Sequence, residues 1–135
     1  MIIRARIVIS MEGAPIEEGA VVITGNRIVA VGPASELVPH FAGELIDLGG
    51  ATLLPGLINA HCHLDYTLLR HAISPQKSFA GWVQRLNAIK RNLDSEDWMK
   101  SIAKGFEECI RFGTTTVCNI ESFPELMPRL PAAPI

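Results

Sequence analysis

The feature that most constrains the fold is a short stretch, residues 53–65, in which an apolar strand ends in two histidines separated by one residue. Its sequence is Leu-Leu-Pro-Gly-Leu-Ile-Asn-Ala-His-Cys-His-Leu-Asp. Because side chains alternate between the faces of a strand, His61 and His63 point the same way and Cys62 points the other way. Two imidazoles on one face, at the end of a buried strand, provide half of a site for a divalent transition metal. The competing interpretation is a chance pair of surface or core histidines.

The chain before this stretch has the pattern of a small β module. Residues 2–10 alternate, with Ile3, Ala5, Ile7 and Ile9 on one face and Arg4, Arg6, Val8 and Ser10 on the other, which predicts a half-buried strand. Two β-rich runs, residues 20–24 and 27–31, flank Gly25-Asn26 and predict a tight hairpin. A helical turn over 33–37 and a strand over 45–48 follow. The pattern favours a small β-sandwich that supports the rest of the chain.

After the histidines the pattern changes to alternating helix and strand. Residues 67–77 have the composition of a loop, and Ser78 is a candidate N-cap for a helix with one apolar stripe. The stripe contains Phe79, Trp82, Val83, Leu86 and Ile89. A second helix is predicted from Asp94-Ser95 to Gly113, with an ion pair between Glu107 and Arg111. Its inward residues are expected to be Trp98, Ile102, Phe106, Cys109 and Ile110.

The end of the chain is expected to hold one more strand and then an extended stretch. The β-branched run 114–120 predicts a second strand of the same sheet, with Asn119 and Glu121 at its carboxyl end. These two polar residues are candidates for a functional edge of the sheet, although turn formers are common at such positions. From Pro124 onward the prolines favour an extended chain.

Four segments together resemble one enzyme family. They are residues 55–65, Leu68-Leu69-Arg70, residues 79–83 and residues 113–117. Their order and spacing are similar to those of the amidohydrolase superfamily, in the branch that contains the cytosine, guanine and adenosine-type deaminases and the chlorohydrolases. The resemblance implies an α/β fold with two parts. Residues 1–54 would form the small N-terminal β-sandwich module, which the family completes with strands from the far C-terminus. Residues 55–135 would form the first β/α units of an incomplete, metal-dependent (β/α)8 barrel.

The length of the chain limits what this resemblance can supply. A (β/α)8 barrel needs roughly 200 residues or more, and this chain has 135. In the family the remaining metal ligands, a histidine from each of two later strands and a late aspartate, come well downstream. We therefore expect the N-terminal portion of an amidohydrolase, with no catalytic residue inside the portion and no activity in isolation. The remainder of its own polypeptide would be its first partner.

The resemblance also implies a cofactor and a reaction. His61 and His63 would hold a divalent metal, with zinc as first choice and iron as the alternative, and a metal-activated water would deaminate a heterocyclic or nucleoside-like substrate. Arg70 lies in the loop after the histidines, where it either binds a polar substrate group or steadies the loop. Trp82 either lines a pocket for a flat heterocycle or packs in the core. The Pro-x-Glu that nucleoside deaminases of this branch often carry is absent from residues 87–91.

The composition of the chain limits the classes of partner that it can have. A net charge of −2 gives no basic surface for a nucleic acid, and no apolar run approaches a membrane span or a signal peptide. Three cysteines without framework spacing fit a reducing cytoplasm. A small-molecule substrate and a homo-oligomer are compatible with these properties. The rival to the enzyme hypothesis is a non-catalytic assembly module that binds metal weakly or not at all.

Overall fold

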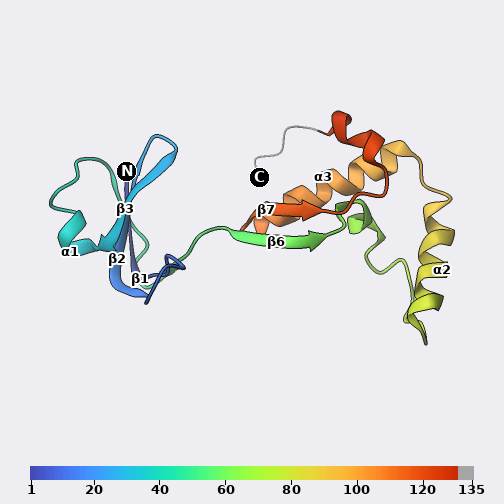
Figure 1. Ribbon diagram of the computed structural model, residues 1–135, viewed down its shortest axis with the longest axis horizontal. Helices are drawn as coiled ribbons and strands as arrows, with labels where there is room; N and C mark the ends of the chain where they lie inside the picture. Colours follow the sequence, from blue (N-terminus) through green and yellow to red (C-terminus); the bar gives the residue numbers. More distant parts are fainter. Residues whose placement is uncertain (131–135) are drawn as a thin grey trace. The chain divides into compact units, whose positions relative to one another are not determined.

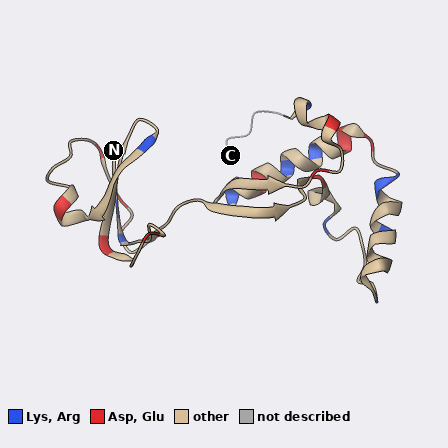
Figure 2. Ribbon diagram, in the orientation of Figure 1, with Lys and Arg blue, Asp and Glu red and all other residues tan. Residues whose placement is uncertain are grey.

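The computed structural model describes residues 1–130 of the chain (Figure 1). The chain divides into two compact units, Met1–Pro55 and Gly56 to the C-terminus. The division falls inside the Pro55-Gly56 pair, where the sequence pattern changes from strands to alternating helix and strand. Charged residues of both signs occur in each unit, and α3 carries both signs along its length (Figure 2).

Unit 1 is one five-stranded sheet with a short helix. Its elements are β1 (Ile2–Val8), β2 (Ile16–Thr24), β3 (Arg27–Pro33), α1 (Ala34–Leu37), β4 (Leu45–Asp47) and β5 (Thr52–Leu53). The strand order is β3-β2-β1-β4, with antiparallel pairing among β1, β2 and β3. Both β4 and β5 pair with β1 in parallel, one at each end of the strand. The described residues thus supply one layer of the expected sandwich.

The central strand β1 is buried on both faces, so the prediction of a single buried face is wrong. Ile2 and Val8, on the face assigned to solvent, are each 2% exposed, and Ala5 on the other face is 1% exposed. The reason is that side chains pack against both faces: Ile2 lies in a cluster with Ala34 of α1, whereas Ala5 and Val8 lie in another with Val21. The predicted hairpin is confirmed: Thr24 pairs with Arg27, and Gly25 has a φ of +60°. A glycine at the first loop position is typical of a type II′ turn.

Unit 2 is a parallel strand pair with two connecting helices. Its elements are β6 (Leu57–Cys62), η1 (Leu64–Leu69), α2 (Phe79–Lys90), α3 (Ser95–Arg111), β7 (Thr114–Asn119) and η2 (Pro124–Arg129). The strands β6 and β7 are parallel, so the chain between them makes one β/α/β crossover, and α3 lies along the pair (Figure 1). This arrangement brings the carboxyl ends of β6 and β7 to the same edge of the sheet.

Both long helices begin where the sequence predicts. The Ser78 hydroxyl accepts a hydrogen bond from the backbone N–H of Gly81, and Asp94 forms a capping box with Asp97. The expected ion pair inside the second helix is wrong: Glu107 pairs with Lys104 at 2.9 Å instead of Arg111. Arg111 lies over the Phe112 ring, which occupies its guanidinium elsewhere.

The expected inward stripe of α3 is only partly buried. Trp98 and Ile102 are buried, Phe106 and Cys109 are half-buried, and Ile110 is exposed. On α2, of the predicted stripe only Leu86 is buried. Strand β6 is also exposed along most of its length, although its composition predicts burial. The faces of a parallel strand are buried by the helices that pack on them, and among the described residues α3 packs mainly on β7.

Two short helices replace segments that were expected to be irregular. The helix η1 extends into the predicted loop, and η2 occupies residues for which an extended chain is expected. Pro124 stands at the first position of η2, where its missing N–H costs nothing. The expectation for residues 131–135 lies outside the described residues. Within residues 1–130, none of the helices has both the length and the apolar character that a membrane crossing needs.

Candidate metal centre

The two histidines lie at the carboxyl end of β6. His61 is the second-last residue of the strand, and His63 is the N-cap of η1. The end of the strand is held in register with β7, because the backbone N–H of Ile120 donates to the carbonyl of Cys62 at 2.8 Å. The histidine pair is therefore attached to regular secondary structure on both sides.

The two imidazole rings lie close together. Their centroids are 5.4 Å apart, and the ring planes are inclined at 74°. A tetrahedral zinc ion with Zn–N bonds of about 2.0–2.1 Å would hold two imidazole centres roughly 5 Å apart. The observed separation thus fits two imidazoles on one ion.

The two histidines differ in their surroundings. His61 is exposed, whereas His63 is half-buried and its Nδ1 is enclosed without a hydrogen-bond partner among the described residues. A buried ring nitrogen without a partner is costly, and because Nδ1 is enclosed, Nε2 is the nitrogen of His63 that would hold a metal. Within residues 1–130 no group of three or more His, Cys, Asp or Glu side chains could hold a metal ion. The donors present fit half of a metal site.

The side chain of Cys62, between the two histidines, contacts β7. Burial raises the pKa of its thiol above the ordinary value of 9.0, and Cys109, Cys118 and Asp65 raise it further. The thiol lies against β7, 3.7 Å from the carbonyl oxygen of Cys118.

Asn119, at the end of β7, fixes the start of η1. Its Oδ1 accepts a hydrogen bond from the backbone N–H of Leu64 at 2.9 Å, and its Nδ2 donates to Glu121 at 3.2 Å. Leu64 follows His63 directly and is 4% exposed. The two polar residues that the sequence places at this edge therefore hold the backbone next to the histidines.

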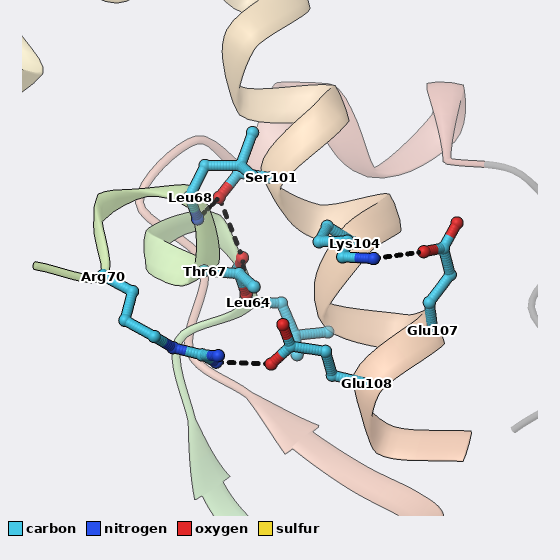
Figure 3. Close-up of polar contacts among 8 residues, drawn as sticks. All are labelled: Leu64, Thr67, Leu68, Arg70, Ser101, Lys104, Glu107 and Glu108. Carbon is cyan, nitrogen blue, oxygen red and sulfur yellow. Dashed lines mark hydrogen bonds and ion pairs between the residues drawn. The ribbon is translucent and has the colours of Figure 1, made fainter. Parts of the chain in front are cut away.

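Arg70 extends from the end of η1 to α3. Its guanidinium forms an ion pair with Glu108, and Figure 3 shows the two side chains facing each other. The hydroxyl of Ser101 accepts from the backbone N–H of Leu68 at 3.0 Å and donates to the carbonyl of Leu64 at 3.3 Å. The ion pair with Glu108 supports the second role considered for Arg70, which is to steady the loop. Its role in substrate binding stays a prediction.

Trp82 lies in the first half of α2 and is 38% exposed. Its indole stacks on Phe79, with centroids 5.8 Å apart. Trp82 and Arg70 line the same hollow of about 180 Å³, together with Tyr66, Leu69, His71, Ile73 and Leu86. Ligand pockets usually measure roughly 300–1,000 Å³, so this hollow is part of a pocket at most. The structure does bring together the two residues that the sequence singles out for substrate.

Three residues near the histidines were missed by the sequence analysis. Tyr66 stacks on His63, with centroids 5.0 Å apart and planes inclined at 6°. Lys90 donates to the Tyr66 hydroxyl at 2.9 Å. Asp65 is fully buried, and neither carboxylate oxygen has a partner among the described residues. Tyr66 and Lys90 meet through contacts between distant elements, which the sequence does not indicate. Asp65 stands two residues after His63, so its position near the pair could have been read from the sequence.

Comparison with known proteins identifies the family of this chain. Residues 52–130 match the amidohydrolase family, and residues 19–42 match the imidazolonepropionase-like composite domain of bacteria. The chain belongs to the amidohydrolase family. Its fold is α/β, with a small N-terminal β module followed by the first β/α units of the family's barrel.

Individual amidohydrolases resemble most of this chain. A 5-methylthioadenosine/S-adenosylhomocysteine deaminase of Syntrophobacter fumaroxidans is 38% identical over 114 residues, which are 83% of this chain and 26% of the relative. The structure of a zinc-bound adenosine deaminase from Xanthomonas campestris is 27% identical, with a TM-score of 0.69 over 88% of this chain and 28% of the other.

The zinc complex of an atrazine chlorohydrolase from Arthrobacter aurescens is also 27% identical, with a TM-score of 0.74 over 87% of this chain and 28% of the other. The chain thus spans about a quarter of the length of the relatives that it matches.

Proposed function

We propose that this chain supplies the first part of a metal-dependent hydrolase that removes an amino group from a heterocyclic or nucleoside-like substrate. The observation that carries the proposal is the pair of imidazoles, His61 and His63, with centroids 5.4 Å apart at the carboxyl end of β6. Active sites of barrel enzymes lie at this end of the strands. The names of similar amidohydrolases, which are adenosine-type deaminases, support the reaction class.

In this proposal His61 and His63 hold a divalent metal as neutral imidazoles. Zinc is the first choice because structures of two similar amidohydrolases carry zinc. A zinc ion at this position would supply the Lewis acidity that allows water to act as a nucleophile near neutral pH. The imidazoles must be deprotonated to bind the ion, so acid should weaken metal binding.

The side chains of the 180 Å³ hollow would contact the substrate. Trp82 lines the hollow with an aromatic side chain on which a flat heterocycle can stack. The Arg70 side chain is 59% exposed in spite of its ion pair with Glu108, so its guanidinium can also reach a polar group of the substrate. Tyr66 connects the hollow to His63 through its stacked ring.

Activity would belong to the whole protein and not to these residues alone. The chain spans 26% of the relative from S. fumaroxidans, and within residues 1–130 only two candidate metal ligands come together. We propose that the remainder of the polypeptide completes the metal site and the barrel. The coding sequence past Ile135 would then encode two further strand-end histidines and a late aspartate. Their absence would contradict the proposal.

The direct test is ammonia release. Purified whole protein, loaded with zinc, is incubated with 5′-methylthioadenosine, S-adenosylhomocysteine and adenosine, and ammonia is measured by a coupled assay. We expect release from at least one of them, with His61→Ala and His63→Ala each losing more than about a hundredfold in rate. The variant His40→Ala is the control, because His40 lies in unit 1 and should leave the rate unchanged. Full activity in His63→Ala would reject the assignment.

A second candidate function is that of a non-catalytic assembly module. It is favoured by the small number of candidate metal ligands in residues 1–130. Two imidazoles leave a tetrahedral zinc ion with two free positions, so the 135-residue chain should lose zinc readily. Metal analysis after dialysis measures this. Loss of zinc from the chain but retention by the whole protein supports the enzyme. Loss from both supports the assembly module, and one zinc retained by the chain alone would contradict the half-site.

A further inference from the structure

The imidazole of His63 lies flat against the ring of Tyr66. The planes are inclined at 6° and the centroids are 5.0 Å apart. Histidine ligands are usually oriented by a hydrogen bond from the second ring nitrogen to an acceptor. The Nδ1 of His63 has no such partner among the described residues. The stacked phenol therefore takes the place of the missing hydrogen bond, because rotation of the imidazole about its Cβ–Cγ bond would drive it into the Tyr66 ring.

Tyr66 is itself held by a closed set of polar contacts. The Lys90 ammonium donates to the Tyr66 Oη at 2.9 Å and to the Ser122 Oγ at 3.0 Å, and the two hydroxyls lie 3.1 Å apart. The three residues come from η1, the end of α2 and the segment after β7. A phenol fixed at its hydroxyl and confined at its face has little freedom to move away from the imidazole.

Lys90 is placed by an aromatic environment. Its ammonium lies 5.7 Å from the ring centres of both Trp98 and Phe123, and these two rings pack together at 4.9 Å. Trp98 is 3% exposed, so this wall belongs to the core of unit 2. A lysine in contact with aromatic faces and two hydroxyls loses the freedom that exposed lysines keep. Lys90 thus connects the core of unit 2 to Tyr66.

We propose that Lys90 and Tyr66 are positioning residues for the metal ligand His63: Lys90 holds Tyr66, and Tyr66 sets the orientation of the imidazole. The inference rests on the proposed function, because it assumes that His63 binds a divalent metal. Neither residue touches the ion. Both act through the ring of His63, and their effect should appear in metal affinity and in the environment of that ring.

The test uses the full chain, with zinc alone as the probe and ring resonances of histidine as the readout. In Lys90→Met, which keeps the length but loses the charge and donors, we expect zinc affinity to fall about tenfold. The upfield ring-current shift of the His63 ring protons should also decrease. Tyr66→Phe keeps the stacked ring but loses the anchor, so a smaller loss is expected. Lys90→Arg should restore part of the affinity.

A double variant and a matched control make the test specific. Because Lys90 and Tyr66 act through one contact, Lys90→Met combined with Tyr66→Phe should bind zinc no more weakly than Lys90→Met alone. Lys104→Met removes a lysine that pairs with Glu107 on α3, and it should change neither readout. Unchanged zinc affinity and unchanged His63 shifts in Lys90→Met and Tyr66→Phe would overturn the inference, even if their melting temperatures fall.

The proposed metal site is tested separately. If His63→Ala binds zinc as tightly as the parent chain, the metal site itself is wrong and this inference falls with it. If His63→Ala loses zinc while Lys90→Met and Tyr66→Phe keep it, only the positioning role is rejected.

Discussion

At the scale of single residues, the backbone on both sides of His63 is fixed by different kinds of contact. Cys62 belongs to the β6–β7 ladder, whereas Leu64 has its N–H satisfied by the side chain of Asn119. Among residues 1–130, the Nδ1 of the imidazole between them has no hydrogen-bond partner. The position of His63 thus depends on one amide side chain and on the stacking of Tyr66.

Replacing Asn119 by alanine should destabilise unit 2. The backbone N–H of Leu64 would lose its acceptor in a buried place, which costs about 1–3 kcal/mol of unfolding free energy. Asn92→Ala is the control, since the exposed Asn92 donates only to the carbonyl of Ala88 and its removal should cost less than about 0.5 kcal/mol. Urea unfolding followed by circular dichroism measures both. Equal stabilities of the two variants would count against the role of Asn119.

The thiol of Cys62 should make stability depend on alkaline pH. Burial raises its pKa above the ordinary value of 9.0, so above that pH the folded chain keeps a proton that the unfolded chain has lost. Because the folded state then binds more protons, its stability falls as pH rises beyond about 9. Cys62→Ala removes this contribution. Measured from pH 7 to 10.5, the unfolding free energy of the parent should fall relative to that of Cys62→Ala. A constant difference would contradict the raised pKa.

At the scale of elements, the contact between η1 and α3 decides where the residues after His63 lie. The Ser101 hydroxyl on α3 bonds to the backbone of both Leu64 and Leu68, and Arg70 pairs with Glu108 about two helical turns further along α3 (Figure 3). Gly105 lies between these two anchors and is buried. The close approach of η1 to α3 depends on the absence of a side chain there.

Gly105→Ala should loosen this contact. A Cβ at residue 105 would lie 2.8 Å from both Leu64 Cδ2 and Thr67 Oγ1, closer than ordinary van der Waals contact. Overpacking costs about 1–3 kcal/mol and the better helix propensity of alanine returns at most about 1 kcal/mol, so a net loss of about 1–2 kcal/mol is expected. Gly50→Ala is the control, because no atom lies within 4 Å of a Cβ there. Thermal unfolding measures both, and an alanine at 105 that raises the melting temperature would contradict the packing.

Elements with a local cause could be predicted from the sequence. Gly25-Asn26 makes the hairpin, Ser78 and Asp94 cap the two helices, and the β-branched run before Asn119 forms β7. Each of these depends on a few neighbouring residues. The close approach of His61 and His63 is of the same kind, since their spacing keeps the two rings near each other.

Other features depend on contacts between distant parts of the chain and were missed for that reason. The helix η1 is stabilised by hydrogen bonds to Ser101, which comes 33 residues after Leu68 and 37 residues after Leu64. The burial of Ile2 on β1 requires packing against Ala34, which lies on α1 much later in the sequence. The contact of Lys90 with Tyr66 joins two helices, and nothing in the sequence of either indicates the other.

At the scale of the whole molecule, the chain exposes a large apolar surface. Ile58 on β6 is 73% exposed and Phe79 on α2 is 79% exposed. Both residues belong to segments whose apolar composition predicts burial. The strand pair β6–β7 also has open edges among the described residues. Exposed apolar side chains and unpaired strand edges favour association.

The 135-residue chain alone should therefore self-associate. Light scattering at rising protein concentration is expected to show a mass above 14.7 kDa. Ile58→Lys combined with Phe79→Lys should lower the apparent mass, because two charges interrupt the apolar surface. The matched control, Leu68→Lys, also adds a charge at an exposed leucine but lies on η1, and a smaller effect is expected. A parent chain that stays monomeric would contradict this expectation.

The central claim is that His61 and His63 bind one divalent ion together. A titration with zinc, followed by the ring resonances of ¹⁵N-labelled histidine, tests it most directly. We expect the His61 and His63 resonances to shift along one saturation curve, while those of the other two histidines, His40 and His71, stay in place. Shifts that follow separate curves, or that leave His63 unchanged, would contradict it.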